Sequence, residues 1–278
     1  MRIILLLLCT TPLLFVACSS QETPADTEAK VGKTITIAPK SLPAGNEPNP
    51  SAEGFNRSGS DNKAIMLADS IMKYHGGRKA WDDARFIRWN FFGARTLSWD
   101  KHESRVRIDV PKENMVYLLD YSGEELTGRI RKLGDEVVDE DALAEGLSKA
   151  YSMFINDAFW LVQQFKLKDA GVTLKYAGDA RVDPQAGRPS HIVDQTFAGV
   201  GDTPNNKYRL YVDKVTYRIN TWQFFRDAND AEPAIETPWK GYLPYGDLLL
   251  SGDRGDRFQL TDISVSKTMK EEVFTAFE

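Results

Sequence analysis

The chain reads YRLYVDKVTYRINTWQFF over residues Tyr208–Phe225, and this stretch decides the fold class. Apolar side chains recur at every second position on either side of Asp213-Lys214, so that Tyr217 and Ile219 share one face. Alternation with period two is typical of a half-buried β-strand. The stretch therefore predicts two antiparallel strands with a two-residue link, although Asp-Lys is not the pair that tight hairpins prefer.

The same alternation recurs along the body of the chain, and turn residues separate the runs. Such spacing favours antiparallel neighbours in a sheet. Further strands are predicted in the regions 87–91, 106–110, 115–121, 172–176, 191–197, 239–250 and 258–265. Strands and helices do not alternate regularly and no internal repeat occurs, so one large antiparallel sheet is expected.

A first helix is predicted before the strands begin. Apolar side chains recur at helical spacing from Ala64 to Tyr74, and Gly76-Gly77 ends the pattern. Ser60 or Asp61 can cap its start. A short turn of helix is expected over residues 79–84.

A second helix interrupts the strands in the middle of the chain. It begins at Asp139-Glu140-Asp141, where a helix N-terminus favours negative charge, and runs to about Lys168. Residues 158–165 are apolar on almost every face of the predicted helix, so this part is either buried or covers another apolar surface. The predicted class is α+β: a large curved antiparallel sheet, a half-barrel, with helices covering its concave face.

The N-terminal stretch MRIILLLLCTTPLLFVACSS has the form of a secretory leader. Its apolar run is interrupted by Pro12 and is too short to span a ~30 Å hydrocarbon core, which needs ~20 residues. The run ends at Ala17-Cys18, which resembles a bacterial lipoprotein signal in which Cys18 becomes the lipidated first residue. An ordinary cleaved signal peptide is the alternative. Ser19, in place of an Asp after the cysteine, indicates the outer membrane.

These features divide the chain into three parts. Residues 1–17 are predicted to be the signal peptide, 18–61 the lipidated Cys18 with a flexible linker, and 62–278 the half-barrel domain. The linker lacks apolar periodicity and is rich in Pro, Ser, Asn and Gly, a composition that cannot bury enough surface to order itself. About 40 such residues span roughly 35 Å. The expected place is the cell envelope of a diderm bacterium, with the body tethered to the membrane through the N-terminal lipid.

Composition excludes several classes of partner. The formal net charge of −5 argues against a nucleic acid or an anionic membrane surface as a partner. The chain has two cysteines, of which only Cys18 follows the signal, so the fold is expected to hold without a disulfide. The sequence does not predict an oligomeric state.

Several stretches of the chain resemble those of a known protein family. The stretches that carry the likeness are Tyr74-His75-Gly76-Gly77, Phe159-Trp160-Leu161-Val162, Phe165-Lys166-Leu167-Lys168-Asp169 with Gly171, Tyr211–Trp222, and Gly241-Tyr242-Leu243-Pro244. Their order is similar to that of the LolA/LolB-like superfamily of outer-membrane lipoprotein carriers and receptors, and closest to a branch of lipoproteins from diderm bacteria. The resemblance implies a half-closed antiparallel sheet that wraps a hydrophobic cavity under helices and holds acyl chains. It implies no catalytic residue.

Motifs that are typical of catalytic, nucleotide-binding or metal sites do not occur in the sequence. The three histidines, His75, His102 and His191, lie far apart without metal-ligand spacing, and His75 fits a helix end. No GxSxG, P-loop or GxGxxG motif occurs. Arg254-Gly255-Asp256 is an adhesion tripeptide by letter, but between two strands it is read as a turn. No catalytic residue, metal site or cofactor is therefore predicted, and the chain is not expected to be an enzyme.

The candidate binding residues are the large apolar side chains on the dry faces. A curved sheet under an apolar helix can leave a cavity that suits a lipid tail. The candidates for its lining are Trp89, Phe91, Tyr117, Leu119, Trp160, Phe165, Tyr217 and Phe225.

Three functions stay open at this point. The leading hypothesis is a lipoprotein that binds a hydrophobic ligand, either a lipid or the acyl part of another lipoprotein, without chemistry. The alternatives are an envelope interaction or assembly module with a solid core, and an enzyme on envelope substrates. The presence or absence of a cavity separates the first two.

Overall fold

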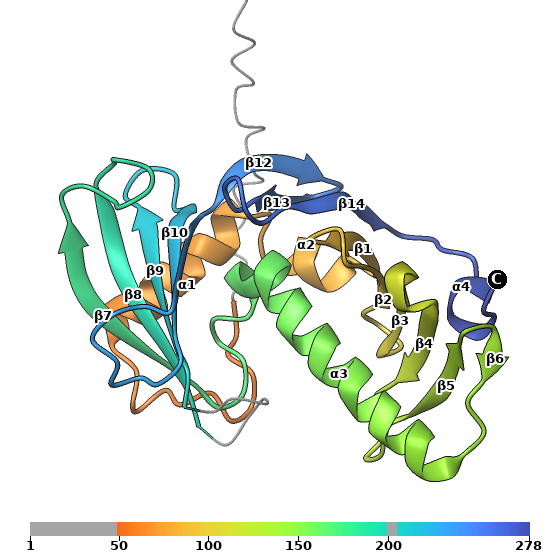
Figure 1. The fold of residues 1–278 in the computed structure, drawn as a ribbon. Helices are drawn as coiled ribbons and strands as arrows, with labels where there is room; N and C mark the ends of the chain where they lie inside the picture. The colour runs from red at the N-terminus through yellow and green to blue at the C-terminus, as the bar shows by residue number, and fades with distance from the viewer. Residues whose placement is uncertain (1–48, 199–204) are drawn as a thin grey trace, which may run out of the picture. The chain divides into compact units, whose positions relative to one another are not determined.

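A computed structural model describes residues 49–198 and 205–278. The predicted lipidation site Cys18 and the predicted signal peptide lie outside the described residues. The fold class is α+β, as predicted (Figure 1). The helices and 3-10 turns are α1 (Asn62–Tyr74), α2 (Arg78–Asp83), η1 (Pro111–Glu113), α3 (Glu140–Val162), η2 (Gln163–Phe165) and α4 (Glu272–Thr275). The strands are β1 (Phe86–Phe91), β2 (Arg95–Asp100), β3 (Arg105–Val110), β4 (Met115–Asp120), β5 (Thr127–Lys132), β6 (Asp135–Glu136), β7 (Val172–Ala180), β8 (Ser190–Phe197), β9 (Lys207–Asp213), β10 (Ile219–Phe225), β11 (Ile235–Pro238), β12 (Lys240–Tyr245), β13 (Leu248–Asp253) and β14 (Leu260–Ser266).

A large antiparallel sheet of seven strands carries α3 on one face (Figure 1). Its order is β14-β1-β2-β3-β4-β5-β6, and its two edge strands do not pair with each other, so the sheet is open. Val106, Ile108 and Val110 are buried while Arg105, Arg107 and Asp109 between them are partly exposed, which is the alternation that predicted this strand.

The remaining described strands form two further sheets, where the sequence predicted a single one. Strands β7 to β11 form a five-stranded antiparallel sheet in the order β11-β10-β9-β8-β7, and β12 and β13 form a hairpin. The predicted strand 239–250 is this hairpin, which turns at Gly246 with φ +60°. Glycine populates positive φ without steric cost, and the strand prediction did not account for it.

The stretch Tyr208–Phe225 forms β9 and β10, but its turn is longer than predicted. One carboxylate oxygen of Asp213 accepts hydrogen bonds from the backbone N–H groups of Val215 (2.9 Å) and Thr216 (2.7 Å). An aspartate that bonds its own backbone in this way forms a turn. Tyr217, predicted to lie in a strand, therefore sits in the loop with φ +50°.

Helix α1 covers the predicted segment, and Asp61 is its N-cap residue by position. Its carboxylate does not cap the helix; it accepts the backbone N–H of Tyr176 (2.9 Å) and the ammonium of Lys175 (3.1 Å). The predicted cap therefore holds α1 against β7.

Helix α3 ends at Val162 and continues as the 3-10 turn η2 to Phe165, short of the predicted Lys168, and side chains satisfy its last carbonyls. The guanidinium of Arg254 donates to the Trp160 carbonyl (2.5 Å), and the amide of Gln164 donates to the Leu161 carbonyl (3.2 Å). At the other end, Asp139 accepts the N–H of Ala142 (2.9 Å), as its N-cap position predicts. The end of the helix is thus tied to the loop after β13.

Part of the segment assigned to the linker has a described structure. Phe55 is buried, the backbone N–H of Asn56 donates to Val172, and that of Asp61 donates to Leu174. Residues 49–61 therefore run along the domain, while the position of the linker boundary remains a prediction.

Candidate functional site

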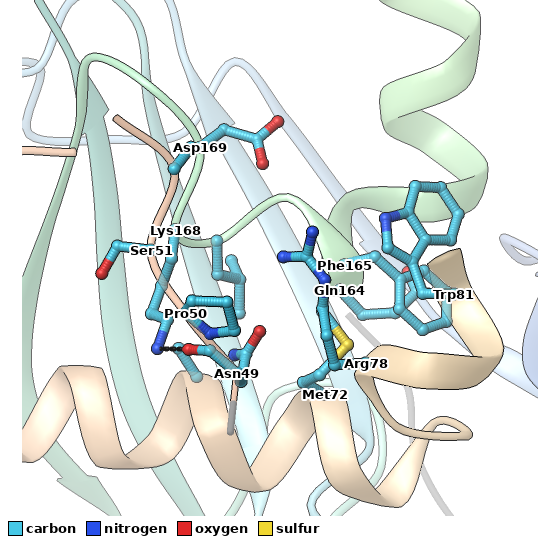
Figure 2. A pocket seen from close by; sticks show the side chains of 13 residues that line it. Asn49, Pro50, Ser51, Met72, Arg78, Trp81, Gln164, Phe165, Lys168 and Asp169 are labelled. Atoms are coloured by element: carbon cyan, nitrogen blue, oxygen red, sulfur yellow. Dashed lines mark hydrogen bonds between the residues drawn. The ribbon is translucent and has the colours of Figure 1, made fainter. Parts of the chain in front are cut away.

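A cavity of about 140 Å³ lies where α1, α2 and η2 meet (Figure 2). Four elements supply its walls: α1, α2, the segment from η2 to Asp169, and the N-terminal residues 49–52. Its lining residues are Asn49, Pro50, Ser51, Ala52, Ala68, Met72, Arg78, Trp81, Gln164, Phe165, Leu167, Lys168 and Asp169.

The inner wall of the cavity is apolar. Trp81 and Phe165 stack face to face, with ring centroids 4.6 Å apart and an interplanar angle of 4°. Ala68 and Met72 come from one face of α1, where the i, i+4 spacing places them above each other. With Leu167 these side chains are all buried, so the wall belongs to the main core.

The N-terminal residues close the cavity from outside and are held by polar contacts. We call residues 49–52 the strap. The ammonium of Lys168 donates to the Asn49 carbonyl and to Asp69 (2.5 Å), and the Asn49 amide donates to Asp69 (2.9 Å). The backbone N–H of Ala52 donates to the Lys168 carbonyl (2.9 Å). The strap therefore depends on a few hydrogen bonds around one lysine.

Positive charge surrounds the outer face of Trp81. The ammonium of Lys101 lies 4.8 Å from the centre of the Trp81 ring and donates to the Asp82 carbonyl (3.3 Å). Burial lowers the pKa of Lys101, and the neighbouring cations Arg78 and Lys166 lower it further. Arg78 itself pairs with Asp82 at 2.8 Å.

A second hollow of about 490 Å³ is open to solvent and lined by polar side chains, among them Arg85, Arg105 and Glu271. Its cations already have partners: Arg105 pairs with Glu271 (2.5 Å) and both arginines pair with the buried Asp100. The hollow is therefore a surface ion-pair network.

The sequence matches no family model. No curated protein matches it either. Solved structures do. A DUF1329 family protein from Desulfovibrio piger is 11% identical with a TM-score of 0.41, over 77% of this chain and 98% of that one. A domain described as an outer membrane lipoprotein-sorting protein, from Vibrio parahaemolyticus, is 11% identical with a TM-score of 0.42, over 76% and 96%. MucB is 17% identical with a TM-score of 0.23, over 76% and 62%.

The structures to which this chain is similar thus include the kind of protein that the sequence resembles. With TM-scores below 0.5 and identities below 25%, they carry nothing about function. Function has to follow from the contacts and cavities of this chain.

The structure brings most of the predicted binding residues into one core. Those in the main buried cluster are Trp89, Phe91, Tyr117, Leu119, Trp160 and Phe165. Phe165 also lines the cavity. Trp160 packs against Phe92 (5.0 Å) and Trp222 (4.6 Å), so the space beside this part of α3 is filled by rings.

Two predicted residues lie elsewhere. Tyr217, in its loop, packs against Tyr74 with ring centroids 4.9 Å apart and the ring planes tilted by 35°. Phe225 is buried outside the main cluster, with the ammonium of Lys207 4.2 Å from its ring centre. Phe225 lies outside the cluster because an irregularity between Ile219 and Thr221 shifts the alternation of β10 by one residue.

Four cavity residues were not predicted from the sequence: Trp81, Met72, Arg78 and Gln164. The short helix that carries Trp81 was predicted, and a lone tryptophan there was the available signal. Its stacking partner Phe165 comes from a distant part of the chain, so sequence spacing could not join them.

Two findings concern other kinds of site within residues 49–198 and 205–278. No cluster of three His, Cys, Asp or Glu side chains there has the arrangement to hold a metal ion. None of the helices described there is both long and apolar enough to cross a membrane.

His75 is the C-cap residue of α1, as its place before two glycines predicted. It is fully buried, and its Nδ1 lies 2.8 Å from the Ile71 carbonyl, to which it donates. Nε2 then faces the interior without a partner among the described residues. Burial lowers the pKa of His75 to about 4.

This burial makes the stability depend on pH. Between pH 6.5 and about 4 the unfolded chain binds a proton at His75 and the folded chain does not. We therefore expect the free energy of unfolding to fall by about 3 kcal/mol from this residue as the pH drops through that range. Urea denaturation of the wild type and His75→Gln over that range measures it. An identical pH profile for both proteins would contradict the assignment.

Proposed function

We propose that this protein is a lipoprotein of the bacterial envelope, anchored through a lipid on Cys18, and that its domain binds a hydrophobic ligand without catalysis. The ligand is a lipid or the acyl part of another lipoprotein. The outer membrane is the proposed location because Ser19 follows Cys18. The cavity beside Phe165 is the observation that carries the proposal.

The cavity has the composition of a ligand site. Apolar side chains of Ala68, Met72, Trp81 and Phe165 line its inner wall together with the buried side chain of Gln164, and ligand pockets commonly combine apolar walls with a few polar groups. Its volume of about 140 Å³ is below the ~300–1,000 Å³ of pockets for drug-sized ligands. A longer ligand would therefore enter where the strap lies, since the strap is held mainly by polar contacts.

Aromatic rings pack inward from the cavity. Trp81 packs against Trp99 (6.1 Å), and Trp99 packs against Phe154 of α3 (5.1 Å). Aromatic rings thus continue from the cavity into the core. Under this proposal the other predicted residues of the core form the deeper wall, and Phe165 forms the entrance.

Filling the cavity tests this function. Ala68 lines it, so Ala68→Leu should weaken the binding of a fluorescent fatty acid at least several-fold. Ala64→Leu is the matched control, because Ala64 is buried on the same helix but does not line the cavity. Titration of both variants and the wild type by fluorescence gives the comparison. If the two variants bind like the wild type, the cavity is not the site.

Releasing the strap should have the opposite effect. Lys168→Met removes the charge-assisted hydrogen bonds to Asn49 and Asp69, each worth about 1.5–3 kcal/mol. We expect faster hydrogen exchange at the backbone amides of Ser51 and Ala52, and tighter binding of the fatty acid.

Lys175→Met is the control for the strap. It breaks the Lys175–Asp61 pair (3.1 Å). This pair also fastens the N-terminal segment, but neither residue lines the cavity. Exchange mass spectrometry on the three proteins separates the two sites. Equal exchange at residues 51 and 52 in all three would rule out Lys168 as the strap's fastening.

The second candidate is an envelope interaction module with a solid core. The close packing of Trp89 (0% exposed) and Tyr117 (1% exposed) favours it. It predicts that Ala68→Leu changes no function and that the fatty acid does not bind.

A further inference from the structure

The end of the chain folds back on the seven-stranded sheet, on the face opposite α3. Val106 and Ile108 of β3 are buried in the main cluster, on the face that α3 covers. Arg105 and Arg107 alternate with them and therefore lie on the other face, where α4 contacts β3 and β4. We call residues 271–278 the C-terminal arm.

Arginines hold the main chain of this arm. The guanidinium of Arg107 donates to the carbonyls of Ala276 (2.7 Å) and Phe277 (3.1 Å). The guanidinium of Arg129, on β5, donates to the carbonyl of Thr275 (3.1 Å). Cations interact favourably with the last carbonyls of a helix such as α4. Every peptide has main-chain carbonyls, so these contacts hold a backbone and do not require one sequence.

Two aromatic rings supply the apolar contacts of the arm. Phe274 is buried against Phe86 of β1, with ring centroids 5.9 Å apart, and the Arg105 guanidinium lies 5.0 Å from its ring centre. Phe277 follows three residues later, and the Arg129 guanidinium lies 4.6 Å from its ring centre. Each ring thus packs against an arginine, and a guanidinium over a ring face is attractive.

Opposite charge fastens the start of the arm. Glu271 pairs with Arg105 at 2.5 Å, and its side chain is 63% exposed. The hydrogen bond from Arg105 lowers the pKa of Glu271, so this carboxylate is charged at neutral pH. The arm therefore presents an acid to the sheet, an aromatic residue three positions later, and a second aromatic residue three positions after that.

The face that the arm covers is apolar, although the outer face of an antiparallel sheet is commonly polar. Leu118 lies directly between Arg107 and Arg129 in the strand register and is 5% exposed. Leu118, Phe86 and Phe274 are all buried, yet none of the three belongs to the main core cluster. The outer face thus has buried apolar side chains of its own, one of which the arm supplies.

The arm can leave this face without disturbing the sheet. Strand β14 ends at Ser266, and Lys267, Thr268 and Lys270 after it are exposed. No residue of the arm forms a strand pair within the described parts of the chain. Its departure would expose arginines beside apolar side chains, which is the composition of a surface that binds another segment.

We propose that this outer face is a docking site for a peptide segment of another protein, and that the arm occupies the site when this partner is absent. The segment is acidic and carries two aromatic side chains three residues apart, because the face complements Glu271, Phe274 and Phe277 in charge and ring position. The site shares no residue with the cavity beside Phe165. The inference therefore goes beyond the proposed function and does not rest on it.

The partner competes with the arm, and this competition is the basis of the test. Phe274→Ser together with Phe277→Ser removes both rings of the arm and leaves the face intact; we call this protein the released variant. A labelled peptide with the sequence of residues 267–278 should bind the released variant about tenfold more tightly than the wild type, because occupancy by the arm lowers the apparent affinity. Glu272→Gln, at an exposed position of the arm, is the matched control and should bind like the wild type.

Fluorescence polarisation gives the affinities, on the chain from residue 18 on with Cys18→Ser to prevent lipid attachment. Arg107→Met in the released variant should weaken peptide binding about tenfold, because it removes charge-assisted hydrogen bonds. Arg88→Met, at an exposed position of β1 on the same face, should leave binding unchanged. If the released variant does not fold, Glu271→Lys takes its place, since it reverses one exposed charge against Arg105 and should also raise the affinity for the peptide.

A second peptide decides whether the face binds a pattern or only this chain's own sequence. It keeps the glutamate and the two phenylalanines and has serine at the positions between them. Comparable binding of both peptides to the released variant supports the proposal, and binding of the first peptide alone would overturn it. Equal affinity of the first peptide for the released variant and the wild type would overturn it as well. So would a dimer of the wild type that the peptide dissociates in analytical ultracentrifugation, because the occupant would then be a second copy of the chain.

Discussion

Replacing Arg254 by methionine should lower the free energy of unfolding by about 3 kcal/mol, because it leaves buried acceptors unpaired. Arg254 is 1% exposed, although it belongs to an Arg-Gly-Asp tripeptide. Its guanidinium donates to the carbonyls of Trp160 (2.5 Å) and Ser251 (3.0 Å) and to the Ser251 hydroxyl (2.7 Å). The tripeptide is a turn between strands, as predicted.

Arg254 is buried and forms no ion pair with a carboxylate among the described residues, and other groups stabilise its charge. Its guanidinium lies 3.8 Å from the centre of the Trp239 ring and at the C-terminal end of α3, where the helix carries partial negative charge. Burial lowers the pKa of Arg254 to about 9, so the group stays charged at neutral pH.

Two further variants make the Arg254 experiment specific. Arg254→Lys should also destabilise the protein, because an ammonium cannot reproduce the planar stack and the fork of donors. Arg257→Met, at an exposed position nearby, should change stability by less than about 0.5 kcal/mol. Urea denaturation of the four proteins gives the differences. A loss below about 1 kcal/mol for Arg254→Met would show that the carbonyls find other partners.

The second large effect is expected at the pair between Arg95 and Asp157. Asp157 lies on α3 with a fully buried side chain, and Arg95 donates two hydrogen bonds to it (2.6 and 2.7 Å). Arg95→Met would leave a buried carboxylate without its partner, at a cost of about 3–5 kcal/mol. Asp157→Asn should cost less, because the Arg95 side chain is 20% exposed and can turn toward water.

Lowering the pH should reduce the loss of stability caused by Arg95→Met. Burial raises the pKa of Asp157 even with Arg95 present, and without Arg95 the pKa should rise further. When a carboxyl group has a higher pKa in the folded state than in the unfolded state, the free energy of unfolding rises as the pH falls through that folded-state pKa. The deficit of Arg95→Met relative to the wild type should therefore shrink from pH 7 to pH 5 in urea denaturation. An unchanged or growing deficit would contradict a buried charge as the cause.

Together these contacts fasten the C-terminal half of α3. Asp157 ties it to β2, and the Trp160 carbonyl ties it to the loop after β13. Lifting this part of α3 to admit a ligand would break both. The strap is held by hydrogen bonds around Lys168 and not by a buried ion pair, so we expect the end of η2 to be the easier entrance to the apolar interior.

The sequence predicted elements whose pattern is local. The helices α1 and α3 and the strands β1, β3 and β4 follow from periodicity, because apolar side chains on one face suffice to define them. Strand β2 was not predicted, and its last residue Asp100 is a charged side chain that is nevertheless buried. Asp100 is buried with the arginines Arg85 and Arg105, which no local pattern reveals.

The candidate site was predictable only in part. Phe165 was found because an apolar run at a helix end indicates burial. The cavity itself joins three distant parts of the chain through Trp81, Phe165 and the strap, which spacing does not encode. Phe225 was placed on the apolar face because a one-residue irregularity in β10 cannot be read from alternation.

Native mass spectrometry of the chain from residue 18 on, carrying Cys18→Ser to prevent lipid attachment and purified from a bacterial host without detergent, tests the central claim most directly. The proposed function predicts a lipid adduct bound one to one, which is reduced in Ala68→Leu and retained in Ala64→Leu. A clean ligand-free mass, together with no uptake of a fluorescent fatty acid, would contradict it.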